Sequence, residues 1–341
     1  MLLLLYTDKQ ERMNALFSSL SSNQFNLDIN ISNGRKTVIE NGNTMQVYSS
    51  RDEVSGELKV SVLGGKRVEH TGIRIELKGV VELSADRSSH EFVSLAREVT
   101  PAGGQQGMQA FKFSFGNAEL PFDSYVGING RVRYYLRAIV SFKNGFGPSA
   151  SQIKETDFIV QSISIPQLPE ATSQTETPDP IVMPGGVKLE VGIEDCLHIE
   201  FVYDKTHFHL TDVVTGRVFF LLVRIKINHM ELSLVRRETA GFSSISAGSS
   251  GVVGSTLATG TTAALTESET LTRFEIMDGA PIKGERIPIR MFLSGLDVGP
   301  TLIGAANCLS VRYFLNLVLI DEEERRYFKQ QEVTLYRASL K

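Results

Sequence analysis

A cysteine, three histidines and a glutamate alternate with other residues in one short stretch, at Cys196, His198, Glu200, His207 and His209. Thiolates, imidazoles and carboxylates are the groups that ligate zinc in proteins. If residues 204–205 form a two-residue turn, all five side chains share one face of a β-hairpin. The first two would lie farther along the ladder than the last three, so the set does not close around one ion. We favour a polar, partly exposed strand face and predict no metal ligands.

The chain lacks the short sequence signatures of common catalytic sites. It has no G-x-x-x-x-G-K-[ST] phosphate loop, no G-x-S-x-G nucleophile elbow and no H-E-x-x-H zinc motif. The consecutive acids of residues 321–326 could act as general acid and base if they lay in a cleft. Because two arginines follow them between two apolar strands, we interpret this run as a solvated hairpin tip. The sequence predicts no catalytic residue, no cofactor and no enzymatic activity.

Strict alternation of apolar and polar residues dominates the chain and predicts half-buried β-strands. The alternating segments are separated by Gly, Pro, Asn and Asp, and no amphipathic helix of 12 residues or more follows residue 25. Many short strands with turn residues between them are typical of antiparallel sandwiches, so we predict an all-β protein. The clearest segments are residues 25–31, 58–62, 73–78, 111–115, 163–165, 187–191, 199–201, 223–227 and 287–291.

Two stretches interrupt this pattern. Residues 166–186 hold five prolines and two adjacent glycines, and proline at this density removes ladder donors, so we predict a linker. It divides the chain into β-sandwiches at 25–165 and 187–341. Residues 240–266 are rich in Gly, Ser, Thr and Ala, and we predict a flexible loop over 240–270. Residues 1–24 are expected to be a disordered extension, with Met13 as an alternative start to Met1.

Composition excludes several classes of protein. Lys and Arg total 35 against 39 Asp and Glu, a formal charge of −4, whereas electrostatic nucleic-acid binders usually carry a basic excess. Two cysteines, Cys196 and Cys308, do not make a disulfide framework, which favours a reducing compartment. No stretch reaches the roughly 20 apolar residues of a membrane span. The sequence therefore predicts a soluble cytoplasmic protein that does not bind nucleic acid.

Long strings in both halves resemble the arrestin-like subunit of retromer, the vacuolar protein sorting-associated protein 26 family. The resemblance covers roughly residues 25–165 and 187–337, and ordered strings of this length are far more specific than a short motif. The matching strings lie at residues 65–76, 90–95, 124–134, 192–201, 218–231, 274–285, 287–290 and 310–332. The linker and the 240–266 loop are both longer than is usual in the family.

The resemblance implies a bilobal arrestin-like fold of two antiparallel β-sandwiches joined by a linker. It also implies a non-enzymatic scaffold in a coat that retrieves transmembrane cargo from endosomes to the Golgi or the cell surface. Its partners would be the solenoid subunit, vacuolar protein sorting-associated protein 35, a sorting nexin and the cytosolic tails of cargo. The location would be peripheral on the cytosolic face of endosomes. Membrane contact would be indirect, because no basic amphipathic segment is visible.

Two sites carry over from the family to this sequence. The solenoid-binding segment corresponds to Ile276, Met277, Asp278 and Gly279, where an exposed apolar pair beside a turn suits a groove. The alternative is that the first two both belong to the core, although alternation lets only one of them point inward. The groove shared by sorting nexin and cargo corresponds to Val191 and Phe328, where a tail would add as a strand and insert an aliphatic side chain. These two could equally be ordinary strand hydrophobes.

Two other functions remain open at this point. The paralogous subunit of the retriever complex has the same fold class, although the strings at 275–279 and 321–326 favour retromer. A zinc-dependent hydrolase on a β-sandwich is the alternative of a different class, because catalytic sites can be built on any fold. Which cargo and which sorting nexin would bind is not encoded in a recognisable motif.

Overall fold

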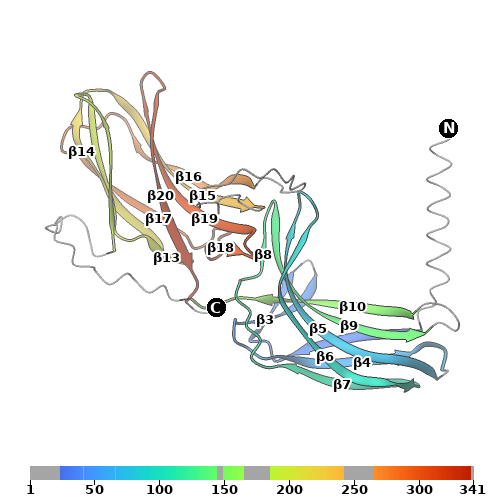
Figure 1. Ribbon diagram of the computed structural model, residues 1–341. Coiled ribbons are helices and arrows are strands. Elements are labelled where there is room, and N and C mark those ends of the chain that lie inside the picture. Colours follow the sequence, from blue (N-terminus) through green and yellow to red (C-terminus); the bar gives the residue numbers. More distant parts are fainter. Residues whose placement is uncertain are drawn as a thin grey trace, which may run out of the picture. The chain divides into compact units, whose positions relative to one another are not determined.

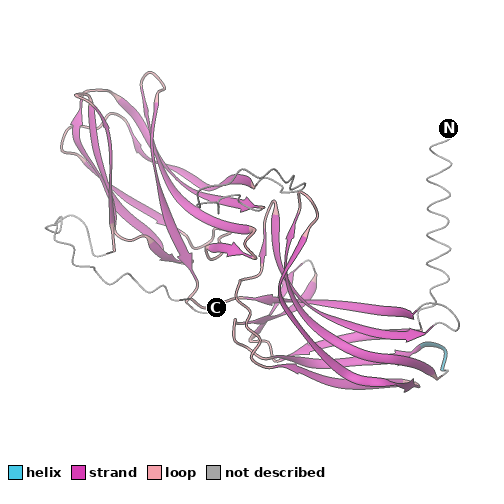
Figure 2. Cartoon of the chain, viewed as in Figure 1, coloured by secondary structure: helices cyan, strands magenta, loops and turns pink. Residues whose placement is uncertain are grey.

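The chain is built from β-strands, which Figure 2 shows throughout the two halves of the molecule. The structure, a computed structural model, describes residues 24–40, 42–65, 67–143, 149–164, 185–241 and 264–338. The predicted N-terminal extension at 1–23, most of the linker and most of the 240–266 loop therefore lie outside the described residues. Within those ranges no helix is long and apolar enough to span a membrane.

The first ten strands form two sheets, of three and seven strands (Figure 1). The three-stranded sheet has the order β1-β4-β7, and the seven-stranded sheet has the order β2-β3-β10-β9-β5-β6 with β8 paired to β9. A single 3-10 turn, η1, spans Leu63–Gly65 within the described residues. The strands are β1 (Phe25–Ser32), β2 (Lys36–Glu40), β3 (Asn43–Tyr48), β4 (Val54–Val62), β5 (Val68–Leu83), β6 (Ser89–Gln105), β7 (Met108–Phe115), β8 (Tyr125–Val126), β9 (Gly130–Lys143) and β10 (Ser149–Val160).

The next ten strands form sheets of four and six strands. The four-stranded sheet has the order β11-β12-β14-β17, and the six-stranded sheet has the order β13-β20-β19-β15-β16 with β18 paired to β19. The strands are β11 (Val187–Ile193), β12 (Leu197–Tyr203), β13 (His207–His209), β14 (Val213–Val223), β15 (Ile227–Ala240), β16 (Leu265–Asp278), β17 (Arg286–Phe292), β18 (Leu302–Ala305), β19 (Leu309–Asp321) and β20 (Arg326–Tyr336).

Burial follows the alternation of the sequence. In β1, Phe25, Leu27 and Ile29 are buried while the residues between them are exposed. The same pattern buries Ile73 in β5 and Ile199 in β12. Burying one face of each strand against another sheet is the main favourable term for such a fold. The predicted all-β class with antiparallel sheets is therefore confirmed.

The chain divides into two compact units. The first comprises Met1–Gly79, Val93–Leu120 and Tyr134–Ile159, and the second comprises Val80–Phe92, Pro121–Arg133 and Val160–Lys341. Two segments that the sequence analysis placed in the first sandwich, Val80–Phe92 and Pro121–Arg133, thus group with the second unit. The long strands β5 and β9 each have one end in the first unit and the other end in the second. A division based on continuous segments of sequence does not show this.

Three predicted element boundaries differ from the structure. The alternation at 223–227 does not make a strand, because β14 ends at Val223 and β15 begins at Ile227. Here Arg224 N–H bonds to the Cys196 carbonyl and the chain turns. The segment at 163–165 follows the end of β10 and its described part is not strand. Residues 265–270, expected at the end of the flexible loop, belong to β16, whose backbone pairs with β15.

The hairpin tip predicted at 321–326 joins β19 to β20, and Glu322, Glu323 and Glu324 are exposed as expected. Asp321 differs, because its side chain is only 1% exposed. Its carboxylate accepts hydrogen bonds from the backbone N–H groups of Glu323 and Arg325, from Arg325 Nε at 2.7 Å and from the Tyr327 hydroxyl at 2.8 Å. Burial alone would raise the pKa of Asp321, but these donors outweigh it and lower the pKa to about 2.

We expect the tip to lose stability in acid. A carboxylate whose pKa is lower in the folded protein than its ordinary value of 3.8 stabilises the fold above pH 4, and this contribution disappears as the pH falls toward 2. Asp321→Asn should therefore melt below wild type at pH 7, and the difference should shrink between pH 4 and pH 2. Thermal unfolding followed by circular dichroism measures both. Glu323→Gln, in the same turn, is the control, and a pH-independent difference for Asp321→Asn would contradict the assignment.

Candidate functional site

Strand β16 bulges near its end, at Ile276. Met277 pairs with Met230, and Glu275 pairs with the next residue of β15, Glu231, so Ile276 has no opposite partner. A bulge breaks strict alternation and re-aims the side chains around it. Both residues are consequently only partly buried. Met277 is opposite the buried Met230, so its side chain is on the inner face of the sheet, and Ile276 is the residue that bulges.

A turn fixes the exit from β16. Asp278 is exposed and pairs with His229 in the ladder, and Gly279 N–H donates to the Asn228 carbonyl at 2.7 Å. Gly279 has φ of 99°, in the region that favours glycine. Asn228 Nδ2 in turn bonds to the Asp321 carbonyl. The four predicted solenoid-binding residues therefore form one continuous surface at the end of the six-stranded sheet.

Charged groups flank this apolar pair. Glu231 lies 3.7 Å from Arg273 and 3.9 Å from His229 Nε2. Partly exposed ion pairs contribute little to stability, with a median of about 0–1 kcal/mol, but they set which surface is complementary. The surface thus has an apolar centre with a polar margin, which is the usual arrangement of a protein contact.

Phe328 lies on the solvent face of β20 and is 69% exposed. It is opposite Val318 of β19, and the residues on either side of it alternate inward. A phenylalanine exposed to this extent on a regular strand buries little in the chain itself, so its apolar surface is available to a partner. Among the described residues, β13 covers only Thr334–Tyr336 on the outer edge of β20.

Val191 lies in β11, the edge strand of the four-stranded sheet. It is partly exposed and pairs with the buried Ile199, so its side chain is on the inner face of that sheet. Strands β11 and β20 lie next to each other at one edge of the sandwich. The structure thus brings together the strands that carry Val191 and Phe328, with Val191 directed inward and Phe328 outward.

One row of the six-stranded sheet connects Phe328 with the end of β16. Phe328, Val318, Glu231 and Glu275 are successive cross-strand neighbours on β20, β19, β15 and β16. Three strand spacings separate the ends of this row, about 14 Å. The Ile276–Gly279 surface therefore lies at one edge of the sandwich and the Val191–Phe328 pair at the other, so two partners could bind without overlapping.

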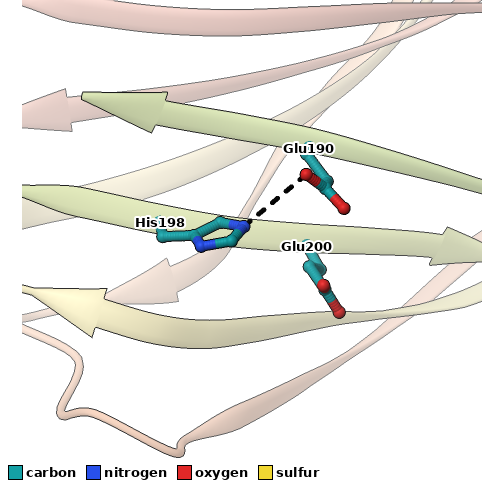
Figure 3. Close-up of side chains that lie close together, drawn as sticks. All are labelled: Glu190, His198 and Glu200. Atoms are coloured by element: carbon teal, nitrogen blue, oxygen red, sulfur yellow. Dashed lines mark ion pairs between the residues drawn. The ribbon is translucent and has the colours of Figure 1, made fainter. Parts of the chain in front are cut away.

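The histidine hairpin considered in the sequence does not form. β12 pairs with β11 and β14, whereas β13 pairs in parallel with β20. His207 and His209 instead make hydrogen bonds to the neighbouring Thr206 and Thr211 hydroxyls. His198 and Glu200 are near a different residue, Glu190 of β11 (Figure 3). The hydrolase alternative loses the constellation on which it rested.

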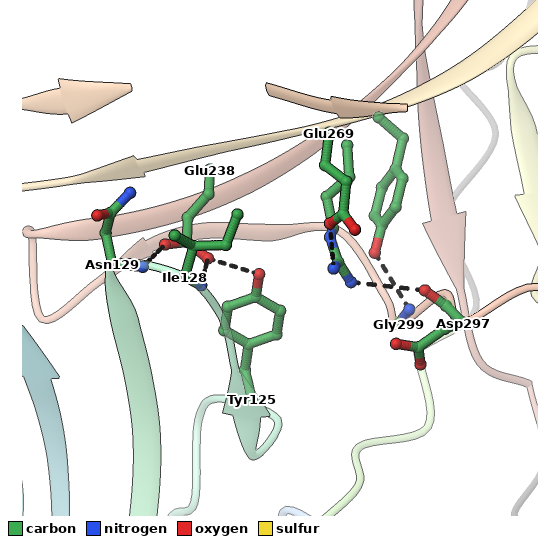
Figure 4. A network of polar contacts seen from close by, with 9 residues as sticks. Tyr125, Ile128, Asn129, Glu238, Glu269, Asp297 and Gly299 are labelled. Carbon is green, nitrogen blue, oxygen red and sulfur yellow. Dashed lines mark hydrogen bonds and ion pairs between the residues drawn. The ribbon is translucent and has the colours of Figure 1, made fainter. Parts of the chain in front are cut away.

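A buried carboxylate in the second unit escaped the sequence analysis. Glu238 of β15 is 3% exposed and accepts hydrogen bonds from the Tyr125 hydroxyl at 2.7 Å and from the backbone N–H groups of Ile128 and Asn129 (Figure 4). Burial and the bond to Glu238 raise the pKa of Tyr125 above its ordinary value. Glu238 directly follows Arg236 and Arg237, so its sequence context looks like a solvated strand face. It is buried only because residues 125–129 pack against it.

Known proteins of one family are similar to this chain over most of its length. The chain matches the family model described as Vacuolar protein sorting-associated protein 26 over residues 22–324. Vacuolar protein sorting-associated protein 26B of Danio rerio is 45% identical over 294 residues, covering 85% of this chain and 77% of that protein. The 26B protein of Mus musculus is 46% identical over 293 residues, covering 85% and 76%. Vacuolar protein sorting-associated protein 26 of Dictyostelium discoideum is 44% identical over 293 residues, covering 85% and 74%.

Proposed function

The chain belongs to the vacuolar protein sorting-associated protein 26 family, and on that premise we propose that it is a non-enzymatic scaffold that docks retromer's solenoid subunit and helps a sorting nexin hold cargo tails. Family membership itself makes it a retromer subunit that acts in protein sorting. The proposal adds the partners and the surfaces that contact them. It also places the protein in the cytoplasm, on the cytosolic face of endosomes and indirectly attached to the membrane.

The observation that carries the solenoid contact is the bulge at the end of β16. The consecutive residues Ile276 and Met277 are both partly exposed there, just before the Gly279 turn. Aliphatic and thioether side chains presented together can fill a shallow groove between helices. Because the pair belongs to a strand held by β15 along its whole length, little ordering entropy is lost when it binds.

The solenoid contact is tested by calorimetric titration of the purified chain into vacuolar protein sorting-associated protein 35. We expect a saturable one-to-one complex with a negative heat-capacity change, since apolar surface is buried. The absence of measurable heat at several temperatures, together with no co-elution in gel filtration, would overturn the retromer scaffold and bring the retriever subunit forward.

Within the described residues, β11 is the end strand of its sheet and β20 has no partner on its outer side before Thr334, which supports the cargo contact. An extended tail can satisfy free main-chain groups by adding as a strand, and an aliphatic side chain can then contact the apolar residues beside it. Val191 and Phe328 are apolar residues on these two neighbouring strands. The sorting nexin would cover the remaining side of the tail.

We expect Val191→Asp and Phe328→Ser each to weaken binding of a cargo-tail peptide, in the presence of the sorting nexin, by about tenfold or more. The aspartate would place a charge beside the inserted aliphatic group, and the serine removes the exposed ring. Fluorescence anisotropy of a labelled tail measures the change. Binding to the solenoid subunit should stay at the wild-type level, because the two sites are on opposite edges. Unchanged tail binding in both variants would exclude this edge as the cargo site.

A further inference from the structure

We propose that Glu190, His198 and Glu200 form a zinc-binding site on the outer face of the four-stranded sheet. Glu190 is on β11, and the other two are on the neighbouring strand β12. One ligand atom from each residue lies within 4.8 Å of the other two, and Figure 3 shows the His198 ring directed toward Glu190 with Glu200 beside them. These three residues differ from the zinc ligands considered from the sequence, because Glu190 replaces Cys196, His207 and His209.

Strand pairing explains why these side chains meet. Glu190 is directly opposite Glu200, and His198 is opposite Gly192, which has no side chain. The imidazole can therefore lean over the empty position toward Glu190, and its Nε2 lies 3.7 Å from a Glu190 oxygen. On the other side of β12 the register with β14 shifts between His198 and Ile199. A bulge of this kind re-aims a side chain, here the histidine.

The distance between the His198 nitrogen and the Glu190 oxygen suits a shared metal ion better than a direct hydrogen bond. A separation of 3.7 Å is too long for a hydrogen bond, whereas two ligands at zinc distances in a tetrahedron are about 3.3 Å apart. Glu200 is held in place, since its side chain is 12% exposed and faces Phe219 of β14. Glu190 and His198 are 57% and 44% exposed, so they can close the small remaining gap.

The chemical types of the three candidate ligands favour zinc over magnesium and calcium. One imidazole nitrogen and two carboxylates suit zinc, with water in the fourth position, whereas magnesium and calcium require more oxygen ligands. Two carboxylates directly opposite each other on adjacent strands repel, so a cation is needed between them. The consequence of binding is that β11, the edge strand that carries Val191, is cross-linked to β12.

Lys188 supplies that positive charge in the absence of zinc. Its Nζ lies 2.7 Å from a Glu200 oxygen and 3.8 Å from a Glu190 oxygen. Zinc must displace this ammonium, so removing it should tighten the binding of zinc. Adventitious binding to scattered surface histidines would not respond in this way, which makes Lys188 the most informative position for a test.

The experiment is calorimetric titration of the full chain with Zn²⁺, with Mg²⁺ as the second ion. We expect saturable Zn²⁺ binding that Glu190→Gln and His198→Gln each weaken about tenfold or more and that Lys188→Met strengthens. His229→Gln is the matched control, because the ion pair that His229 makes within the described residues is with one carboxylate, Glu231. Mg²⁺ should give no heat.

Cobalt substitution provides an independent readout. Bound Co²⁺ should show the visible absorption of a tetrahedral site in wild type and lose it in His198→Gln. Two results would overturn the proposal. One is equal Zn²⁺ affinity in wild type, His198→Gln and His229→Gln. The other is no Zn²⁺ binding in either wild type or Lys188→Met, provided that circular dichroism shows both to be folded.

Discussion

Replacing Ile276 with Asp and Met277 with Asn is expected to weaken binding to the solenoid subunit by about a thousandfold. Each residue is a candidate anchor, and loss of one central anchor costs about 2 kcal/mol or more, so the pair reaches about 4 kcal/mol. The aspartate also brings a charge into a contact that excludes water, where it would have no partner. The same calorimetric titration that detects wild-type binding measures the change.

The structure explains why this variant should remain folded. Both side chains are only partly buried and lie at a bulge, so replacing them opens no cavity in the core. The matched control is Ile303→Asp on β18, an isoleucine that is 64% exposed. β18 pairs with the start of β19, at the opposite end of the same sheet. If Ile303→Asp lost binding as strongly as the double variant, or if the double variant bound normally, the surface at the end of β16 would not be the contact.

Removal of the Glu238 carboxylate is expected to have the largest effect on stability. Glu238→Ala leaves two backbone N–H groups and the Tyr125 hydroxyl without their acceptor in a buried place. An unsatisfied buried donor costs about 1–3 kcal/mol, so we expect a loss of about 3–5 kcal/mol and a melting temperature lower by about 10 °C. Glu238→Gln should rescue only part of this loss, because its amide has one acceptor oxygen and its NH2 group faces other donors.

Two controls separate this network from ordinary surface effects. Tyr125→Phe removes one hydrogen bond and should cost about 1 kcal/mol. Glu269→Ala removes a carboxylate of the same type whose side chain is 46% exposed and which pairs with Arg236 at 2.6 Å (Figure 4). Its cost should be about 0–1 kcal/mol. Differential scanning calorimetry measures all of these values. A Glu238→Ala variant as stable as Glu269→Ala would show that water replaces the carboxylate without penalty.

Close packing around Glu238 explains why residue 127, next to the groups that bond to Glu238, is a glycine. A Cβ added at Gly127 would lie 1.7 Å from a Glu238 oxygen, too close for any side chain there. Residues 125–129 can therefore approach the carboxylate only because position 127 is glycine. In the sequence this glycine looks like one turn residue among many, and nothing near it in the chain indicates Glu238, more than one hundred positions away.

The sequence by itself determined the all-β class, the strand faces and the family. Alternation is a local property, because burying one face of a pleated strand requires an apolar residue at every second position. The core positions of β1, β5 and β12 were therefore readable without a structure. The strings that resemble the family are long enough to specify it, and the family model and relatives confirmed the membership.

Only the tertiary structure decided which residues meet. Pairing partners, bulges and the division into units depend on contacts between distant parts of the chain, which no local pattern encodes. For this reason the histidines at 207 and 209 proved to belong beside β20, while Glu190 came to lie beside His198. The exposure of Ile276 and Met277 together, and the burial of Asp321 and Glu238, have the same origin: the neighbouring strands, and not the residue types, set the environment of each side chain.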